Sequence, residues 1–492
     1  MSCGVELPRL FVYELPASFR RGAPSTAVGF PPLIASEHSH TPEEHHHLHQ
    51  AERVKGPPTS IKLLLESLPP PHCELRKTSN YALAGVFFAK ALAYVCRTYE
   101  PQSADIFFVP VLHEEPGRAN ECLSPACSNP HVLADALRVL RNRRGISYID
   151  ARQGKDHLLL TPREGATSDS RPYGDVDFAK EPFEQSIRLA LEEGAANFSW
   201  PTTRFKIQPY FHSTPFASYV HLPAMSLKAE SERAAPPWRV WRQRVILAST
   251  ASNLHHEGWR IGASGRAVSQ QMNTLRDALY RSCVAANSTR ICSHLPLSPT
   301  HTIRRFHEYS LIREIGGLYA NSVFCLQSVG DQCTRKATID SILLGCIPVF
   351  FHPCQRMQWP WHWGAWIDQA SMYFDIRLVS NGSINVVREL QSVTNQQIRK
   401  MQRVIAEHAH CLHYALPLTS HHELLQSPNT SIEQDSIQPR NKIEFEQQDA
   451  FQISLLGAWR ESRRAGWART QTQLCHRSPV RKDWGHQQKE HL

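Results

Sequence analysis

The sequence predicts an α/β protein of two domains, each a parallel sheet covered by helices in a Rossmann-like arrangement. Its 492 residues exceed what one hydrophobic core usually organises. Short β-prone runs alternate with helical apolar patterns in residues 9–226 and again in residues 240–455, an order typical of parallel sheets. Residues 227–239 between them are rich in Pro, Ala and charges, and we predict a linker there.

The first domain begins with the strand-like run "RLFVYELP" near residue 9. A His-rich insertion at 37–50 follows, and in it His45 and His49 are one helical turn apart. We interpret it as a solvated surface insertion, with metal binding as the alternative. The β-α-β-α-β order of the remaining first domain is inferred from helices expected at 81–96 and 133–140, from a buried strand at 106–109 and from a further strand in "DHLLL", residues 156–160.

The second domain repeats this alternation. Strands are expected in "RVILAS", "SVFCLQ" and "CIPVFF", with helices at 268–283 and 335–344 between them. After residue 455 the chain becomes rich in Arg, Gln and His, so 456–492 is predicted to be a poorly ordered basic tail.

The net charge of the chain limits the kinds of ligand that it is expected to bind. The formal net charge of +9 favours anionic ligands. No run of five basic residues occurs, which argues against a nucleic-acid partner. The Asp-x-Asp triplet within Gly174–Asp177 falls in a polar loop and is interpreted as chance, so no metal site is predicted.

Cysteines and sequons bear on the compartment. Two close pairs, Cys122 with Cys127 and Cys283 with Cys292, are predicted to form local disulfides, although a reducing compartment would leave them as thiols. Four Asn-x-Ser/Thr sequons fit a lumenal protein, namely Asn197, Asn287, Asn381 and Asn429.

A polar loop stands between a strand and a helix in "GDQCTRKATIDSILLGCIPVFFHP", residues 330–353. Thr334 is expected to cap the helix, leaving amide groups and the positive dipole end to hold a diphosphate. Arg335 and Lys336 add charge, and Asp340 is a candidate to bind a ribose. The alternative is that Lys336 and Asp340 form an ordinary ion pair four residues apart on a surface helix.

This stretch resembles the exostosin-like glycosyltransferases (GT47 type), and within them most resembles the plant and algal branch that includes the xyloglucan galactosyltransferases. The family pattern is present as an FCL strand, a GD loop, an arginine, an acidic residue and GCIPV. The resemblance runs from residue 9 to about 455 and implies the GT-B fold, with a nucleotide-sugar cleft between an acceptor-side first domain and a donor-side second domain. The implied donor-binding residues are Gly330, Asp331, Thr334, Arg335, Asp340 and Gly345.

The resemblance further implies an inverting transfer of a sugar of galactose, glucuronic acid, xylose or arabinose type. The donor is expected to be a UDP-sugar used as co-substrate, without a bound cofactor, and the acceptor a polysaccharide or a glycoprotein glycan. A second glycosyltransferase is a candidate partner. The implied location is the Golgi lumen with a type II membrane anchor, which we expect to be encoded upstream of Met1 because the first strand begins near residue 9.

An inverting transferase needs a base to deprotonate the acceptor hydroxyl. Asp156, His157 and Glu164 are candidates where a first-domain strand is expected to meet the cleft, and His113 is a further one. Each could instead be a structural polar residue at a strand end. Many relatives carry Asp-Trp-Gly where this chain has Arg163-Glu164-Gly165, which keeps a degenerate, non-catalytic glycan- or partner-binding protein as an alternative. A cytosolic nucleotide-binding regulator is another.

Overall fold

The computed structural model describes a little over half of the chain, in segments distributed over both predicted domains. These segments are 3–15, 73–75, 78, 82–110, 130–160, 182–191, 211–222, 235–240, 243–254, 263–297, 309–330, 333–415, 448–463 and 474–475. No helix among them is long and apolar enough to cross a membrane.

The first domain is built on a parallel sheet of six strands with the order β3-β1-β4-β5-β6-β7. Two central strands, Ile106–Val109 and His157–Leu160, are buried along their whole length. The continuous apolar run predicted this burial for the first of them. The strands are β1 (Leu10–Val12), β3 (Arg97–Thr98), β4 (Ile106–Val109), β5 (His157–Leu160), β6 (Ile187–Ala190) and β7 (Phe211–Ser213). The accompanying helices are α2 (Leu83–Leu92), η5 (Pro101–Ser103), α4 (Pro130–Arg138) and α5 (Tyr148–Ala151).

The second domain contains a parallel five-stranded sheet with the order β10-β9-β11-β12-β13. Its strands are β9 (Ile246–Ser252), β10 (Cys292–Pro296), β11 (Ser322–Leu326), β12 (Ile347–Phe350) and β13 (Met372–Tyr373). Its helices are α6 (Ala263–Ala285), α8 (Tyr309–Ala320), α9 (Lys336–Leu343), α10 (Pro353–Arg356), α11 (Trp366–Gln369), α12 (Ile376–Ser380), α13 (Val386–Gln391), α14 (Asn395–His408) and η7 (Ala409–Leu412). Two parallel sheets in one α/β chain confirm the predicted fold class, a GT-B arrangement of two Rossmann-like domains.

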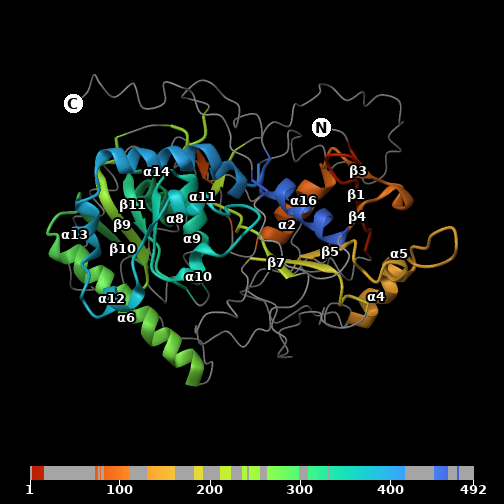
Figure 1. The fold of residues 1–492 in the computed structure, drawn as a ribbon, viewed down its shortest axis with the longest axis horizontal. Helices are drawn as coiled ribbons and strands as arrows, with labels where there is room; N and C mark the ends of the chain where they lie inside the picture. Colours follow the sequence, from red (N-terminus) through yellow and green to blue (C-terminus); the bar gives the residue numbers. More distant parts are fainter. Residues whose placement is uncertain are drawn as a thin grey trace, which may run out of the picture.

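The two domains are joined by more than the chain between them. The last described helix, α16 (Ala450–Ser462), lies beside α2 of the first domain and against β4 and β6 (Figure 1). The rings of Phe451 and Phe87 are 4.7 Å apart, and Lys90 contacts Asp449 at 2.6 Å. The chain therefore returns to the first domain after the second. Helix α16 extends across residue 455, where the second domain was predicted to end.

A second connection is the small antiparallel sheet of β2 (Glu74–Leu75) and β8 (Val220–His221). This sheet packs on α8 of the second domain, where a Cβ on Gly316 would come within 2.6 Å of Leu75 Cδ1. A larger residue at 316 would have to displace the Leu75 side chain. The segment just before β8 is the one that meets α9, as described below.

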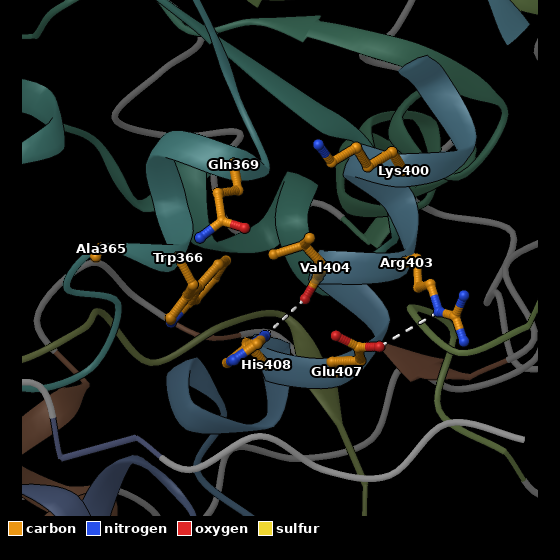
Figure 2. Close-up of a pocket in the computed structure, with 8 residues that line it drawn as sticks. All are labelled: Ala365, Trp366, Gln369, Lys400, Arg403, Val404, Glu407 and His408. Carbon is orange, nitrogen blue, oxygen red and sulfur yellow. Dashed lines mark hydrogen bonds and ion pairs between the residues drawn. The ribbon is translucent and has the colours of Figure 1, made fainter. Parts of the chain in front are cut away.

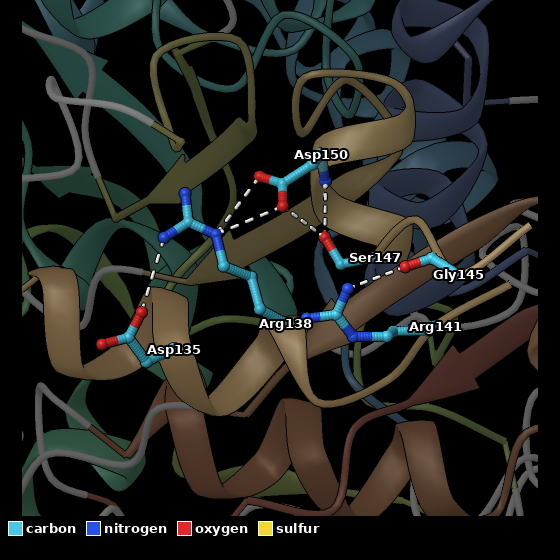
Figure 3. A network of polar contacts seen from close by, with 6 residues as sticks. All are labelled: Asp135, Arg138, Arg141, Gly145, Ser147 and Asp150. Atoms are coloured by element: carbon cyan, nitrogen blue, oxygen red, sulfur yellow. Dashed lines mark hydrogen bonds and ion pairs between the residues drawn. The ribbon is translucent and has the colours of Figure 1, made fainter.

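A polar network fixes the turn between α4 and α5, which cover one face of the first sheet (Figure 3). Ser147 caps α5 by accepting from the amide of Asp150, and Arg138 of α4 reaches the Asp150 carboxylate at 3.2 Å. Gly145 has a φ of +73° in the turn, and its carbonyl accepts from Arg141 at 2.7 Å. The Ser147 cap and the Gly145 turn therefore set the direction of α5, which precedes strand β5.

Candidate functional site

The loop singled out in the sequence lies at the carboxyl edge of the second sheet, where β11 ends and α9 begins. Arg335 occupies the N-cap position in extended backbone, with a φ of −150° and no side-chain capping bond. The expectation that Thr334 caps the helix is therefore wrong, because α9 begins one residue later than a Thr334 cap requires. Asp331 lies outside the described residues. The first turn of α9 still presents its amino end at this edge.

The Arg335 side chain lies across the end of the neighbouring strand β9. Its Nη1 approaches the carbonyl oxygen of Ala251 at 3.5 Å. A Cβ on Gly330 would lie 2.8 Å from Arg335 Cγ, so any side chain at 330 would displace the arginine. Gly330 therefore has a physical role in this loop, which is to let the Arg335 stem pass over the backbone.

A second arginine, Arg276 of α6, supports the same edge and was not found from the sequence. It donates to the carbonyls of Asn253 at 3.1 Å and Val329 at 3.2 Å, and its Nε lies 3.4 Å from Ser328 Oγ. Only 4% of it is exposed. It ties the loop after β9 to the loop after β11. A single arginine in a long amphipathic helix gives no sequence signal that separates it from surface charge.

Two arginines and a helix amino terminus therefore meet at the carboxyl edge of β9 and β11. Their charges and dipole have the same sign, so this edge favours an anion. Arginine can also hold two oxygens of a phosphate group at once. The arrangement suits a diphosphate better than a neutral ligand.

Lys336 and Asp340 form the helical ion pair that the sequence offered as the alternative to a ribose contact. Lys336 Nζ lies 3.0 Å from Asp340 Oδ2, and both side chains are at most 4% exposed. Burial lowers the pKa of Lys336 to about 8, against the attraction of Asp340.

Asp340 also reaches across to the first part of the chain. Its Oδ1 accepts from Ser218 Oγ at 2.6 Å and from the Tyr219 amide at 2.9 Å. Lys336 Nζ lies 3.0 Å from the centroid of the Tyr219 ring. The carboxylate is thus enclosed by structural donors, so a ribose could reach it only after these contacts changed.

Gly345, expected among the donor-binding residues, lies at the other end of α9. It follows the helix in left-handed backbone, with a φ of +76°, as a helix-ending glycine commonly does. Arg244 packs against it and donates to the carbonyls of Leu344 and Ala320, each at 2.9 Å. Since α9 has 8 residues, the two ends are about 12 Å apart. Gly345 therefore lies at the opposite edge from Arg335, and its requirement is conformational.

The base candidates Asp156 and His157 lie at the amino end of β5, which corrects the expectation that this strand would bring them to the cleft. His157 donates from Nδ1 to Asp156 at 2.9 Å, so its Nε2 accepts from the Tyr13 hydroxyl at 2.8 Å. The imidazole is fully buried and stacks on Phe107, 4.9 Å away. Burial also raises the pKa of Tyr13. The three groups form a satisfied core network. Glu164 and His113 lie outside the described residues.

Disulfides occur in both domains, and two of them lie next to the loop. The structure joins Cys283 to Cys292, the pair predicted from the sequence. Among the described residues, four further disulfides were not predicted: Cys3–Cys96, Cys325–Cys346, Cys333–Cys354 and Cys411–Cys475. Cys325–Cys346 and Cys333–Cys354 tie the loop and the ends of α9 to neighbouring elements. Such a density of disulfides suggests a lumenal domain of the secretory pathway.

The other predicted modification and metal positions give a mixed picture. Asn287 and Asn381 are exposed on the second domain, as glycosylation would require. Cys122, Cys127, Asn197 and Asn429 lie outside the described residues, as does the His-rich insertion. Among the described residues, metal-ligand spacing occurs in one group, His410 with Cys411 and Cys475, and there both thiols form a disulfide.

Two α/β domains with parallel sheets and an anion-favouring edge define the class of fold, the GT-B arrangement. The chain belongs to the exostosin GT47 family, whose domain matches residues 6–372. This confirms the resemblance seen in the sequence.

Curated relatives agree with the family. The chain is 24% identical to the probable xyloglucan galactosyltransferase GT17 of Arabidopsis thaliana over 74% of this chain and 72% of that protein. It is 35% identical to the probable xyloglucan galactosyltransferase GT15 of the same plant over 69% of this chain and 65% of that protein. The xyloglucan-specific galacturonosyltransferase 1 of Arabidopsis thaliana is 24% identical over 67% of this chain, which spans only 44% of that protein.

Proposed function

We propose that this protein is an inverting glycosyltransferase that moves a sugar from a UDP-sugar to a polysaccharide or glycoprotein glycan. The observation that carries the proposal is the position of Arg335, at the amino end of α9 and across the carboxyl end of β9. Family membership supports a nucleotide-sugar donor. The names of the relatives favour xyloglucan as acceptor and galactose or galacturonic acid as the sugar transferred.

The proposed chemistry places negative charge on the departing nucleoside diphosphate as the glycosidic bond breaks. Arg335 and the amides of the first turn of α9 would stabilise that charge, and Arg276 would keep the two loops from moving. The bond from sugar carbon to the UDP oxygen breaks, and a bond to the acceptor oxygen forms on the opposite face of the sugar.

The acceptor proton requires a general base, and we identify no candidate among the described residues at the carboxyl ends of the strands. Asp156 and His157 are enclosed at the amino end of β5. Glu164 stays a prediction, since it follows the carboxyl end of the same strand, where acceptor contacts are expected. We propose a Golgi-lumenal, membrane-anchored location, which the disulfides support.

Titration with UDP tests the donor site. Arg335→Ala should weaken UDP binding at least about tenfold, because a charged hydrogen bond contributes roughly 1.5–3 kcal/mol. Arg335→Lys should weaken it less, since it retains the charge and loses the two-pronged contact. Arg377→Ala is a matched control, because that arginine is on α12 of the same domain with its side chain 81% exposed. UDP binding to Arg335→Ala equal to the parent's would refute the donor site.

A screen of UDP-sugars with xyloglucan oligosaccharides tests the reaction. Transfer with inversion at the anomeric carbon, followed by NMR of the product, is the expected result. Retention of configuration would contradict the mechanism. UDP binding without transfer or hydrolysis of any UDP-sugar would favour the non-catalytic alternative.

A further inference from the structure

A pocket of about 430 Å³ lies between α11 and α14, and none of the donor-site residues lines it (Figure 2). Its size falls in the range of small-molecule sites, roughly 300–1,000 Å³. The lining is mixed, with two aromatic rings, an amide, two aliphatic side chains and three charged groups: Ala365, Trp366, Gln369, Lys400, Arg403, Val404, Glu407 and His408.

One wall of the pocket is a fixed aromatic stack. The rings of Trp366 and His408 are 5.4 Å apart and nearly parallel, at 18°. Trp366 donates from its indole nitrogen to the His362 carbonyl at 3.0 Å, and His408 donates from Nδ1 to the Val404 carbonyl at 3.0 Å. Because each ring is held by a backbone acceptor, the wall does not have to reorganise when a ligand arrives.

The rim of the pocket is polar and slightly positive. Arg403 pairs with the buried carboxylate of Glu407 at 3.4 Å, so these two charges offset each other. Lys400 is exposed one turn earlier on α14 and makes no ion pair with another described residue. Gln369 faces it from α11, with an amide that both donates and accepts (Figure 2). The net charge of the rim is therefore that of one lysine.

The charge distribution limits the ligand to a weak anion. Val404, Glu407 and His408 belong to the last turns of α14, where the helix dipole is negative. A diphosphate carries more negative charge than one lysine can balance, and this helix end would repel it. A ligand with a single carboxylate can meet Lys400 at the rim while keeping its uncharged part toward the aromatic wall.

We propose that this pocket binds a uronic acid unit of a glycan, as a glycan subsite outside the reaction cleft. The apolar face of the pyranose would lie toward Trp366 and His408, its hydroxyls would bond to Gln369, and its carboxylate would pair with Lys400. This inference rests on the proposed function in that the bound glycan is the acceptor polysaccharide, and it applies to an acceptor that carries uronic acid residues rather than to a neutral one. Such a subsite would hold an acidic chain while another part of it enters the cleft, which raises the effective concentration of the acceptor.

Calorimetric titration with two disaccharides that differ only in the carboxylate tests the pocket directly. Cellobiouronic acid should bind at least about tenfold more tightly than cellobiose, and Lys400→Glu should abolish this preference. Gln369→Ala should weaken both disaccharides, and neither substitution should alter UDP binding. Arg388→Glu, an exposed charge reversal on α13, is the control and should leave every affinity unchanged.

The outcomes separate the pocket from the proposed function. Equal binding of the two disaccharides, or an unaltered preference in Lys400→Glu, would overturn the inference even if UDP binds normally. If cellobiouronic acid binds through Lys400 while UDP does not bind at all, the subsite stands and the transferase proposal fails. Binding of neither disaccharide by a sample that binds UDP would reject the subsite alone.

Discussion

Replacing Asp340 by asparagine should expose the cost of burying Lys336. The amide oxygen of the introduced asparagine could still accept from Ser218 and Tyr219, so the substitution removes chiefly the negative charge that lies 3.0 Å from Lys336 Nζ. Removing one partner of a buried ion pair typically costs about 3–5 kcal/mol. The lysine can reduce this cost by losing its proton.

The shift in the pKa of Lys336 gives a lower bound for the free energy of unfolding that Asp340→Asn loses. This pKa is lowered by burial to about 8 even with Asp340 present, against an ordinary value of 10.5. Without the carboxylate we expect the pKa of Lys336 to fall further, and each unit of lowering costs about 1.4 kcal/mol while the lysine stays protonated. The free energy of unfolding at pH 7 should therefore fall by between about 1 and about 4 kcal/mol.

The sign of the pH dependence follows from proton uptake. In the unfolded chain Lys336 keeps its proton up to about pH 10.5, whereas in the folded parent it releases the proton near pH 8. The Lys336 ammonium therefore makes the free energy of unfolding rise with pH between these two values, and it leaves that free energy constant below pH 8. In Asp340→Asn the rise begins at a lower pH. The deficit relative to the parent should thus shrink between pH 6 and pH 8 and stay constant above.

Urea unfolding at pH 6, 7.5 and 9 measures this directly. Lys336→Met is the matched control, because it keeps an apolar stem against Tyr219 and should remove the pH-dependent rise altogether. The double variant with Asp340→Asn completes the cycle and gives the coupling energy. A deficit in Asp340→Asn that is equal at pH 6 and pH 9 would refute the assignment of Lys336 as the buried cation. UDP binding by the stable double variant would then show whether Asp340 also contacts the ribose.

Two further substitutions test the ends of the elements. Gly345→Ala should lower the free energy of unfolding by more than about 1 kcal/mol, because φ is +76° and the new Cβ would lie 2.5 Å from Arg244 Nη2; denaturant titration giving an unchanged midpoint would contradict the role of that close approach. Ser147→Ala should cost about 1 kcal/mol through loss of the α5 cap. Desolvation raises the pKa of Asp150, but hydrogen bonds from Ser147 and Arg138 outweigh it, so the pKa is lowered. The parent should therefore lose stability as the pH falls below 3.8, and Ser147→Ala should lose less. Acid titration of the unfolding midpoint measures both.

The architecture was accessible from the sequence because local signals agree with it. A continuous apolar run marked the buried strand β4, the stretch "DHLLL" marked β5, and the helix expected at 335–344 is α9 at 336–343. These features depend on residues that are close in the chain. Strand β7 was missed, since "FHS" is three residues long and has no apolar alternation.

The site was less accessible because its contacts are distant in the chain. Asp340 meets Ser218 across 122 residues, whereas the pattern on one helix could offer only the pair with Lys336. The family motif contains both Gly330 and Gly345, but only the direction of α9 shows that they lie at opposite edges of the sheet. The cysteine pairs Cys325–Cys346 and Cys333–Cys354 share a separation of 21 residues, too long for an argument from local spacing.

Helix α9 links the anion-favouring edge to the arrangement of the two domains. Its amino end places Arg335, its middle is held to the segment before β8 by Asp340, and its carboxyl end is held by Arg244. The helix has only 8 residues, too few to bend between these three attachments. The bonds from Ser218 and Tyr219 to Asp340 therefore tie the segment before β8 to the helix that positions Arg335. A movement that separated this segment from α9 would break these buried hydrogen bonds, so the position of the anion-favouring edge depends on the packing between the two parts of the chain.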